Sequence, residues 1–410
     1  MQILKASKPT GGMEKMTLFS SKEYQPLTES LAVTLAVKMR IFSENAVLSC
    51  SEIGDGNLNL VFRVTDTVTR QGIIIKQALP YAKVVGESWP LTLKRAKIEA
   101  DALKIFGKIA PEYVPVVHFT DDVFAITVMD DLSHLSIART GLIRGEKYPL
   151  LSKHLGEYLA KTLFFTSDFG VNQSEKKELQ RQFINPELCK ITEDLIFTDP
   201  FIDSPTNSFE PELRSAVESI WKDAELIFHV ALLKKSFLTE GEALLHGDLH
   251  TGSVFANATE TKVIDPEFAF YGPGGFDIGQ VFANLLFQAL ANEEKIHEIQ
   301  EHLETFWNVF VDQYSELWNT ENQEPLSYAP GFFDAVIQKF FQDALGFAGC
   351  ELIRRTIGLA HVADLDSIQD IDKRLLVKRK TIDLGKLLIK SKKEIHSIDD
   401  FIKVVVQTLV

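Results

Sequence analysis

The chain has 410 residues, enough for two or three domains or for one two-lobed unit, and 45% of them are hydrophobic, so it can bury a sizeable core. Lysine and arginine total 43 against 57 aspartate and glutamate residues, and this net charge of −14 argues against nucleic acid as the main ligand. The three cysteines are too few and too scattered for a disulfide scaffold or a zinc cluster, which favours a reduced, cytoplasmic setting.

The N-terminal residues 1–24 mix charged residues with proline and glycine. They lack the apolar stretch of a signal peptide, so we expect a loose tail there. The apolar run 278–290 contains Gln280 and Asn284 and is too short to cross a bilayer. We therefore expect a soluble protein without a membrane partner.

Residues 27–40 predict a helix with Thr28 as its N-cap. Apolar residues then fall at positions 58, 60, 62 and 64, a period of two that predicts a half-buried strand. Further strands are predicted at 72–76 and 123–129, with a helix at 91–106 between them. This part of the chain is predicted to be rich in β-structure.

From about residue 150 onward the pattern is helical, with short apolar pieces at 243–245 and 262–264 that each lead into a polar motif. The predicted helical stretches are 150–165, 211–237, 278–290, 293–318 and 332–361. We predict an α+β protein with a β-rich N-lobe at 25–132 and a larger, mainly helical C-lobe at 133–410. The apolar run 401–410 could belong to the core or to an interface.

Carboxylates follow both short apolar pieces. His246-Gly-Asp-Leu-His250 comes directly after residues 243–245, and Asp265-Pro266-Glu267 follows residues 262–264. One carboxylate could orient a hydroxyl while others hold a divalent cation, since Mg²⁺ needs only one or two protein carboxylates. Either loop alone could be a structural turn, but two at this spacing favour a site.

The N-terminal part carries a glycine turn, Gly54-Asp55-Gly56-Asn57, just before the alternating strand. Glycine lets backbone N–H groups approach a phosphate, although an ordinary hairpin turn would look the same. Lys76 closes the strand 72–76, and Glu99 lies in the helix 91–106. A strand lysine paired with a helix glutamate holds ATP phosphates in protein-kinase-like folds, whereas an isolated lysine there is often a surface residue.

The order of these features is similar to that of the protein-kinase-like small-molecule kinases, which include aminoglycoside and choline kinases. More narrowly, the chain resembles the 5-methylthioribose kinases of methionine salvage over about residues 25–405. The motifs that carry this resemblance are Gly54–Asn59, Val84–Pro90, His246–Gly252, Asp265–Phe268 and Glu351–Arg355. The resemblance implies a bilobal protein-kinase-like fold, ATP and Mg²⁺ as cofactors, phosphorylation of 5-methylthioribose at its C1 hydroxyl, and a homodimer.

The resemblance also implies a role for each matched residue. Asp248 would be catalytic, and Asp265 and Glu267 would bind the metal. The sugar pocket would comprise Asp248, Arg354, Arg355 and a covering loop with Trp89. The ATP site would comprise Gly54, Asp55, Gly56, Asn57, Asn59, Lys76, Glu99, Asp265, Pro266 and Glu267, with Asp130, Asp131 and Leu132 as an adenine hinge.

The chain departs from the wider kinase pattern at two places. Ser253 stands where that pattern has an asparagine ligand of the metal, and Asp-Pro-Glu replaces Asp-Phe-Gly. Glu267 can supply the oxygen that the missing asparagine would have offered. Three of the ten histidines, His246, His250 and His361, lie near these motifs but lack metal-binding spacing, so we expect structural roles for them, with His361 in the core.

Other interpretations remain open at the level of sequence. Helical arginines are usually solvated, and neighbouring helix positions differ in direction by ~100°, so Arg354 and Arg355 share a ligand only near a helix end. Trp89 could be core packing. A kinase for a cationic amino-alcohol or aminoglycoside would need acidic residues where these arginines stand. A nucleotide-sensing pseudokinase would lack Lys76, Asp248 or the metal carboxylates, and all of them are present.

Overall fold

The computed structural model describes residues 23–54, 58–82 and 86–409, with the side chains of residues 82 and 86–89 left out of the description. Its internal contacts divide the chain into two units, each of which is described by itself. Unit 1 runs through His134 and also includes Ile264–Glu267, and unit 2 comprises the rest. The expected boundary lay between residues 132 and 133, and the short return of the chain to unit 1 was not expected. Most of the expected tail lies outside the described residues.

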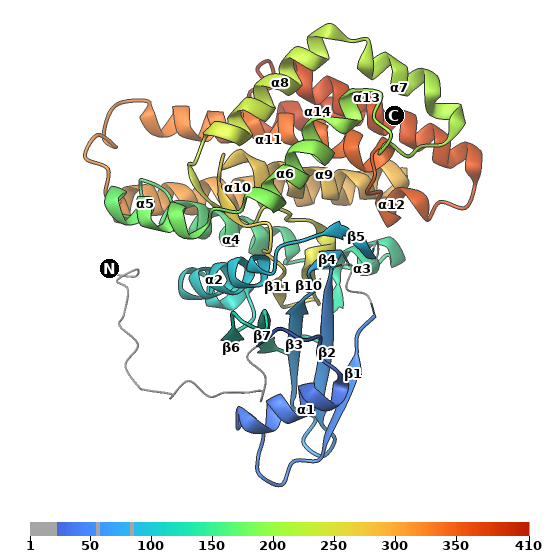
Figure 1. Cartoon of the computed structure of the whole chain (residues 1–410). Helices are drawn as coiled ribbons and strands as arrows, with labels where there is room; N and C mark the ends of the chain where they lie inside the picture. Colours follow the sequence, from blue (N-terminus) through green and yellow to red (C-terminus); the bar gives the residue numbers. More distant parts are fainter. Residues whose placement is uncertain (1–22, 55–57, 83–85, 410) are drawn as a thin grey trace. The chain divides into compact units, whose positions relative to one another are not determined.

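Unit 1 is built on an antiparallel sheet with the strand order β1-β2-β3-β7-β6 (Figure 1). The predicted alternation in β2 is confirmed, because Phe62 and Val64 are buried on one face. In β3, Ile73 and Ile75 are buried, whereas Lys76 points to the opposite face, as the period of two requires. The strands are β1 (Leu48–Glu52), β2 (Asn59–Asp66), β3 (Gly72–Ala78), β6 (Val117–Asp121) and β7 (Ile126–Asp130), beside a separate ribbon of β4 (Tyr81–Ala82) and β5 (Gly86–Pro90).

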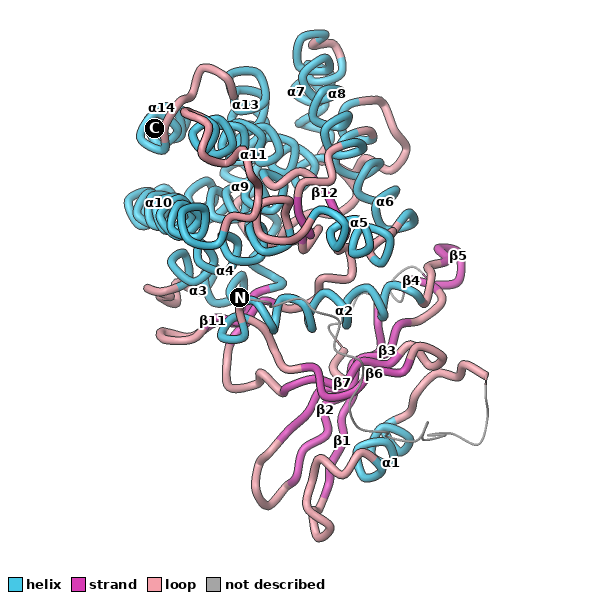
Figure 2. Tube along the Cα trace, turned by 90° about the vertical axis from the view of Figure 1, so that its left-hand side faces the viewer, coloured by secondary structure: helices cyan, strands magenta, loops and turns pink. Residues whose placement is uncertain are grey.

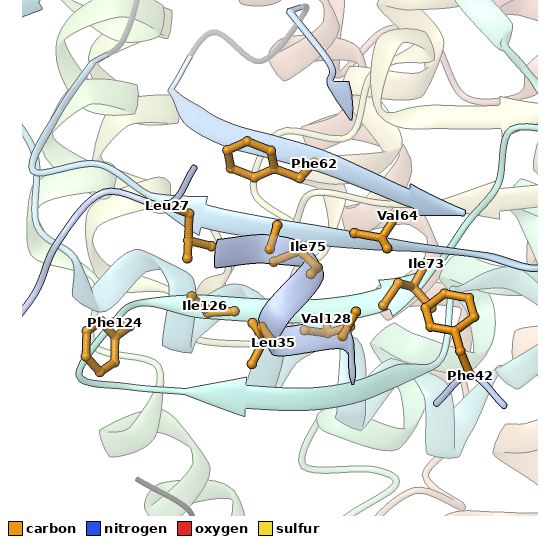
Figure 3. Packing of buried hydrophobic residues seen from close by; sticks show 12 residues of the cluster. Leu27, Leu35, Phe42, Phe62, Val64, Ile73, Ile75, Phe124, Ile126 and Val128 are labelled. Carbon is orange, nitrogen blue, oxygen red and sulfur yellow. The ribbon is translucent and has the colours of Figure 1, made fainter. Parts of the chain in front are cut away.

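Helix α1 (Glu29–Lys38) covers one face of this sheet, and the apolar side chains packed between the helix and the sheet form a hydrophobic core in unit 1. Figure 3 shows Leu27 and Leu35 against the side chains of Ile75, Ile126 and Val128. The predicted N-cap is confirmed, since Thr28 Oγ1 accepts a hydrogen bond of 3.3 Å from Leu31 N. The opposite face, to which Lys76 points, meets helix α2 (Lys94–Ile109).

Unit 2 is mainly helical (Figure 2). Its helices are α3 (Ala138–Arg144), α4 (Leu151–Thr166), α5 (Gln173–Gln182), α6 (Pro186–Phe197), α7 (Arg214–Trp221), α8 (Ala224–Thr239), α9 (Gly275–Ala291), α10 (Ile296–Glu321), α11 (Phe332–Ile357), α12 (Ala363–Asp366), α13 (Ile371–Ser391) and α14 (Ile398–Leu409). Short 3₁₀ turns lie at Pro111–Tyr113 in unit 1 and at Asp199–Phe201, Pro211–Leu213, Thr251–Ser253 and Glu293–Lys295 in unit 2. Helix α9 lies at the centre of the helical unit, and almost every residue along it is buried.

Two small sheets in unit 2 hold the polar loops. Strand β9 (Ala243–Leu245) pairs with β12 (Phe270–Gly272), and β10 (Val254–Ala256) pairs with both β8 (Ser136–Ile137) and β11 (Thr261–Val263). The loop that contains Asp248 therefore begins at the end of β9 and finishes before β10, and residues 264–267 follow β11. The predicted α+β class, with a β-rich N-terminal lobe and a helical C-terminal lobe, is confirmed.

Several local predictions differ from the structure. The stretch 211–237 contains two helices: α7 ends at Trp221, and Asp223 caps the start of α8 by accepting a hydrogen bond from Leu226 N at 3.0 Å. The strand predicted at 123–129 begins only at Ile126, since Asp121 binds the backbone N–H groups of Val123 and Phe124 in a turn. Helices α5, α6 and α13 were not predicted.

The C-terminal apolar run forms α14, and it belongs to the core of unit 2. The ring of Phe401 lies 5.2 Å from that of Phe282 in α9, and Val405 and Leu409 are buried as well. Among the described residues, no helix combines the length and the apolarity that a membrane-spanning segment requires.

Candidate active site

The first polar cluster lies in unit 1 around Lys76 of β3. Its ammonium is 2.8 Å from Glu99 Oε1 on α2, so the expected pair of strand lysine and helix glutamate is present. The same ammonium contacts Asp265, which follows β11. Asp265 has a left-handed backbone (φ 69°), a conformation that aspartate tolerates better than most residues, and its side chain is 42% exposed. One carboxylate of this cluster is therefore accessible to a ligand.

Glu267 lies deeper, with 3% of the residue exposed. Its Oε2 atom accepts hydrogen bonds from Asn59 Nδ2 at 3.3 Å and from Arg95 Nε at 3.2 Å. The side chain of Asn59, expected to touch nucleotide, is thus held by Glu267 and by Arg95, whose Nη2 atom donates to Asn59 Oδ1 at 2.9 Å. Its place as a nucleotide contact stays a prediction.

This cluster is rich in carboxylates. Among the described residues, Lys76 pairs with Glu99 and Asp265, and Arg95 pairs with Glu267. Burial, together with the neighbouring carboxylates Asp265 and Glu267, raises the pKa of Glu99 to about 7 in spite of Lys76. Burial and Asp265 likewise raise the pKa of Glu267. Carboxylate oxygens are hard ligands of the kind that a divalent cation such as Mg²⁺ prefers.

Within the described residues, no group of three or more histidine, cysteine, aspartate or glutamate side chains has the geometry to hold a metal. Asp265 and Glu267 are two carboxylates, which suits Mg²⁺ because that ion usually keeps waters and shares phosphate oxygens. Ser253 is 3% exposed, and its hydroxyl accepts a hydrogen bond from His250 N at 3.0 Å and donates to His250 O at 2.8 Å. These hydrogen bonds show that Ser253 stabilises the 3₁₀ turn at Thr251–Ser253.

The second cluster lies in unit 2 around Asp248. Gly247 has a left-handed backbone (φ 85°), and a Cβ atom there would lie 2.2 Å from the carbonyl oxygen of Phe268, so this position requires glycine. The fully buried Asp277, in the first turn of α9, accepts hydrogen bonds from His246 N at 2.6 Å and from Gly247 N at 3.1 Å. His246 Nδ1 in turn accepts from Asp248 N at 3.3 Å, which agrees with its expected structural role. These contacts fix the backbone that presents Asp248.

Arg354 and Arg355 both reach Asp248 from the last turn of α11. Their Nη2 atoms lie 3.5 and 3.6 Å from Asp248 Oδ1. Both residues are buried, at 6% and 7% exposure, so they are not solvated surface arginines. Glu351, one turn earlier, explains how two successive residues turn to the same side. Its two oxygens accept from Arg354 Nε at 2.5 Å and from Arg355 Nε at 2.8 Å.

These neighbours set the charge of Asp248. Burial raises its pKa, but His250 and the two arginines together outweigh burial and hold the pKa of Asp248 well below its usual range. His250 Nε2 lies 3.5 Å from Asp248 Oδ2, and burial lowers the pKa of this imidazole in spite of the carboxylate. Asp248 is therefore an ionised acceptor at neutral pH, able to take a hydrogen bond from a substrate hydroxyl.

The remaining expected residues are placed as follows. Gly54 lies in the turn between β1 and β2, while Asp55, Gly56 and Asn57 lie outside the described residues, as does the side chain of Trp89. Asp130 ends β7, and its carboxylate accepts from Val116 N at 2.8 Å. Asp131 accepts from Arg63 Nε at 2.7 Å, and Leu132 is buried. Because both carboxylates are bound to other groups of the protein, we expect this segment to contact adenine through its backbone. That contact stays a prediction.

The sequence analysis did not identify Arg95 and Asp277 as positioning residues, and it gave Glu351 no role of its own. The available signal was spacing, since Arg95 precedes Glu99 by one helical turn and Glu351 precedes the arginines by one turn. Nothing in the sequence marked Asp277. His361 was expected in the core, but it is partly exposed and hydrogen-bonded to Asp366 Oδ2 at 2.9 Å and Ser208 O at 2.6 Å.

Comparisons with known proteins point to one family of enzymes. The model of the phosphotransferase enzyme family matches residues 49–304, more than half of the chain. A methylthioribose kinase of Geobacillus sp. (strain WCH70) is 59% identical over 94% of this chain and 97% of its own length. Those of Geobacillus kaustophilus and Bacillus pumilus are 58% and 51% identical, covering 96% and 94% of this chain and 100% and 98% of their own lengths.

Similarity to solved structures is weaker. An ethanolamine kinase of Plasmodium vivax covers 89% of this chain and 89% of its own, with a TM-score of 0.46 at 14% identity.

Proposed function

Because this chain belongs to the methylthioribose kinase family, we propose that it transfers the γ-phosphoryl group of ATP to the C1 hydroxyl of 5-methylthioribose. The products are ADP and 5-methylthioribose 1-phosphate, and the step belongs to methionine salvage. The observation that carries the proposal at the level of geometry is the meeting of Arg354 and Arg355 with Asp248 in one buried cluster.

Asp248 accepts a hydrogen bond from the sugar hydroxyl and orients it for attack. Its low pKa makes it a weak base, which is sufficient because phosphoryl transfer depends mainly on positioning and on charge neutralisation. The arginines supply fixed forks of donors that suit a phosphoryl group or paired sugar hydroxyls. Glu351 keeps both forks turned toward Asp248.

ATP and Mg²⁺ belong to the cluster of unit 1. Lys76, held by Glu99, and the segment Gly54–Asn59 bind the phosphates, and the backbone of residues 130–132 contacts adenine. Asp265, Pro266 and Glu267 form the metal-binding segment, with the two carboxylates as ligands. When bound, Mg²⁺ neutralises the charge of the phosphate oxygens. Trp89 remains a proposed part of the loop that covers the sugar.

A substrate panel tests the reaction. ADP release is measured with ATP, Mg²⁺ and one acceptor at a time: 5-methylthioribose, ribose, choline or an aminoglycoside. We expect turnover with 5-methylthioribose to exceed that with every other acceptor. Choline and aminoglycosides are cationic, and two buried arginines beside Asp248 repel a cation in this pocket. Faster turnover with choline or the aminoglycoside would contradict the proposal, and no ADP release with any acceptor would favour a nucleotide-binding pseudokinase.

The oligomeric state and the location follow from the same premise. We propose a homodimer, as the family resemblance implies, and light scattering of the purified protein measures its mass directly. A kinase that consumes ATP and a product of methionine metabolism works where both metabolites occur, so we place it in the cytoplasm.

A further inference from the structure

Arg95 of α2 is fully buried in unit 1, with no exposed surface. A guanidinium group has five N–H donors and cannot be deprotonated in a protein, so a buried arginine is costly unless each donor finds an acceptor. The structure provides five acceptors. Nε donates to Glu267 Oε2 at 3.2 Å, Nη1 donates to two backbone carbonyls, and Nη2 donates to another carbonyl and to Asn59 Oδ1 at 2.9 Å.

The three carbonyls come from different places in the sequence. Nη1 reaches Leu79 O at 2.7 Å and Thr92 O at 3.1 Å, and Nη2 reaches Leu58 O at 2.7 Å. Residues 79 and 92 flank the β4–β5 ribbon, and residue 58 precedes β2. One planar group thus joins the end of β3, the start of β2 and the beginning of α2 to the carboxylate of Glu267.

Arg95 and Glu99 lie one turn apart on the same face of α2. Glu99 holds Lys76, which contacts Asp265, while Arg95 holds Glu267. Both carboxylates of the Asp-Pro-Glu segment are therefore anchored, directly or through one lysine, to a single helix. Asn59 adds a second contact to the same oxygen of Glu267 that Arg95 binds, so the carboxylate has one orientation.

We propose that Arg95 is a positioning residue of the metal site, which holds the carboxylate of Glu267 in the orientation that binds the divalent cation. This inference rests on the proposed role of Glu267 as a metal ligand. Groups that orient metal ligands affect binding strongly, and their replacement typically costs ~10–100-fold in metal affinity. A lysine keeps the charge of Arg95 but has three donors on one nitrogen, so it cannot join Glu267, Asn59 and three carbonyls at once.

The test measures metal binding without turnover. Mn²⁺ serves as a paramagnetic substitute for Mg²⁺, and its affinity for the full chain with a non-hydrolysable ATP analogue is read by electron paramagnetic resonance. We expect Arg95→Lys and Arg95→Met to weaken Mn²⁺ binding at least about 10-fold. Should Arg95→Met fail to fold, Arg95→Lys carries the test, because it leaves a cation beside Glu267.

A control variant separates positioning from general stability. Leu103→Ala removes a buried apolar side chain of the same helix, 1% exposed, and lowers the melting temperature without removing any polar group of the cluster. We expect it to leave Mn²⁺ affinity unchanged. If Arg95→Lys lowers the melting temperature but keeps the wild-type affinity for Mn²⁺, as Leu103→Ala does, the inference is wrong.

Glu267→Gln distinguishes this failure from failure of the metal assignment. If Glu267→Gln weakens Mn²⁺ binding and the Arg95 variants do not, only the positioning role is overturned. If Glu267→Gln binds Mn²⁺ as tightly as the wild type, then Glu267 is not a ligand, and the metal site proposed above is overturned together with the inference.

Discussion

Asp277 and Glu351 determine what Asp248 can do, although neither is expected to touch a substrate. Asp277 fixes the backbone on which Asp248 stands, and Glu351 fixes the two arginines that face it. Both carboxylates are fully buried. A buried charge that loses a partner is destabilising, and replacement of Glu351 removes one of the carboxylates that compensate the buried Arg354 and Arg355. At the scale of single residues, the site depends on such supporting side chains.

Asp248→Asn keeps the shape of the side chain and removes its negative charge. Orienting and general-base groups contribute ~10²–10⁴-fold, so we expect kcat to fall within that range. The ATP cluster of unit 1 is untouched, so the affinity for a non-hydrolysable ATP analogue should stay within about twofold of the wild type. Steady-state kinetics and calorimetry measure the two quantities, and a variant with more than half of the wild-type kcat would refute the assignment.

His361 predicts a pH-dependent contribution to stability. The hydrogen bond to Asp366 raises the pKa of His361, and its second nitrogen faces the Ser208 carbonyl, so both nitrogens of the protonated ring find acceptors. Burial raises the pKa of Asp366, but the contacts of its carboxylate with His361 and Lys378 outweigh burial and lower this pKa to about 2. Protonated His361 therefore adds to the free energy of unfolding below its unfolded-state pKa of ~6.5. This stabilisation is lost as the pH rises through the higher pKa of the folded state.

Ionised Asp366 adds to the free energy of unfolding above its unfolded-state pKa of ~3.9, and this stabilisation is lost as the pH falls toward 2. The pair is therefore strongest between about pH 4 and 6.5. We expect His361→Gln to lower the melting temperature more at pH 5.5 than at pH 8.5. Equal effects of His361→Gln would contradict the pairing.

At the scale of elements, three helices of unit 2 pack closely enough that small residues are required at their contacts. A Cβ atom on Gly349 of α11 would lie 2.6 Å from the carbonyl oxygen of Gly385 in α13. One on Gly279 of α9 would lie 2.6 Å from the carbonyl oxygen of Ala344 in α11. Since α11 carries Arg354, Arg355 and Glu351, the packing of this helix sets where the arginine pair lies.

Gly349→Ala should therefore destabilise the protein, although alanine is the better helix former. Separation of two backbones costs typically ~1–3 kcal/mol, more than the ~1 kcal/mol gained in helix propensity. Gly107 in α2 is the matched control, because its nearest neighbour to a Cβ atom is a side-chain carbon of Val114 at 3.6 Å. We expect Gly107→Ala to stabilise by ~0.4–1 kcal/mol. Thermal unfolding measures both, and equal shifts for the two variants would refute the close contact.

At the scale of the whole molecule, the two units carry different parts of the proposed chemistry. Unit 1 contains Lys76, Glu99, Asp265 and Glu267, and unit 2 contains Asp248 with its arginines. The first cluster holds three carboxylates, suited to a cation and its nucleotide, whereas the second has fixed guanidinium groups suited to hydroxyls and a phosphoryl group. The chain returns to unit 1 at Ile264–Glu267, and this segment brings the two carboxylates that we propose as metal ligands.

Each ligand should therefore stabilise the protein through its own unit. A ligand at 100 times its Kd stabilises the folded state by ~2.7 kcal/mol. We expect Lys76→Met to lose the rise in melting temperature caused by Mg²⁺ and a non-hydrolysable ATP analogue, and to keep the rise caused by 5-methylthioribose. Arg355→Lys should show the opposite pattern. Retention of the nucleotide effect in Lys76→Met would contradict the assignment of the phosphate site.

Sequence patterns were sufficient for the parts of this protein that depend on local periodicity and on short motifs. The alternation at positions 58–64 predicted β2, Thr28 predicted the start of α1, and the pattern at 332–361 predicted α11. The motifs around Asp248, Asp265 and Arg354 led to the kinase family. Each of these signals lies within a few residues of the chain, where side-chain spacing alone fixes the geometry.

Contacts between distant segments decided the rest. Arg95 meets Glu267 across 172 positions of sequence, Lys76 meets Asp265 across 189, and no periodicity encodes such pairs. The sequence could not show that Arg354 and Arg355 turn to one side, because that depends on the buried carboxylate of Glu351 and on the place of the last turn of α11 beside the Asp248 loop. Buried charges require specific partners, and only the folded chain brings those partners within hydrogen-bonding distance.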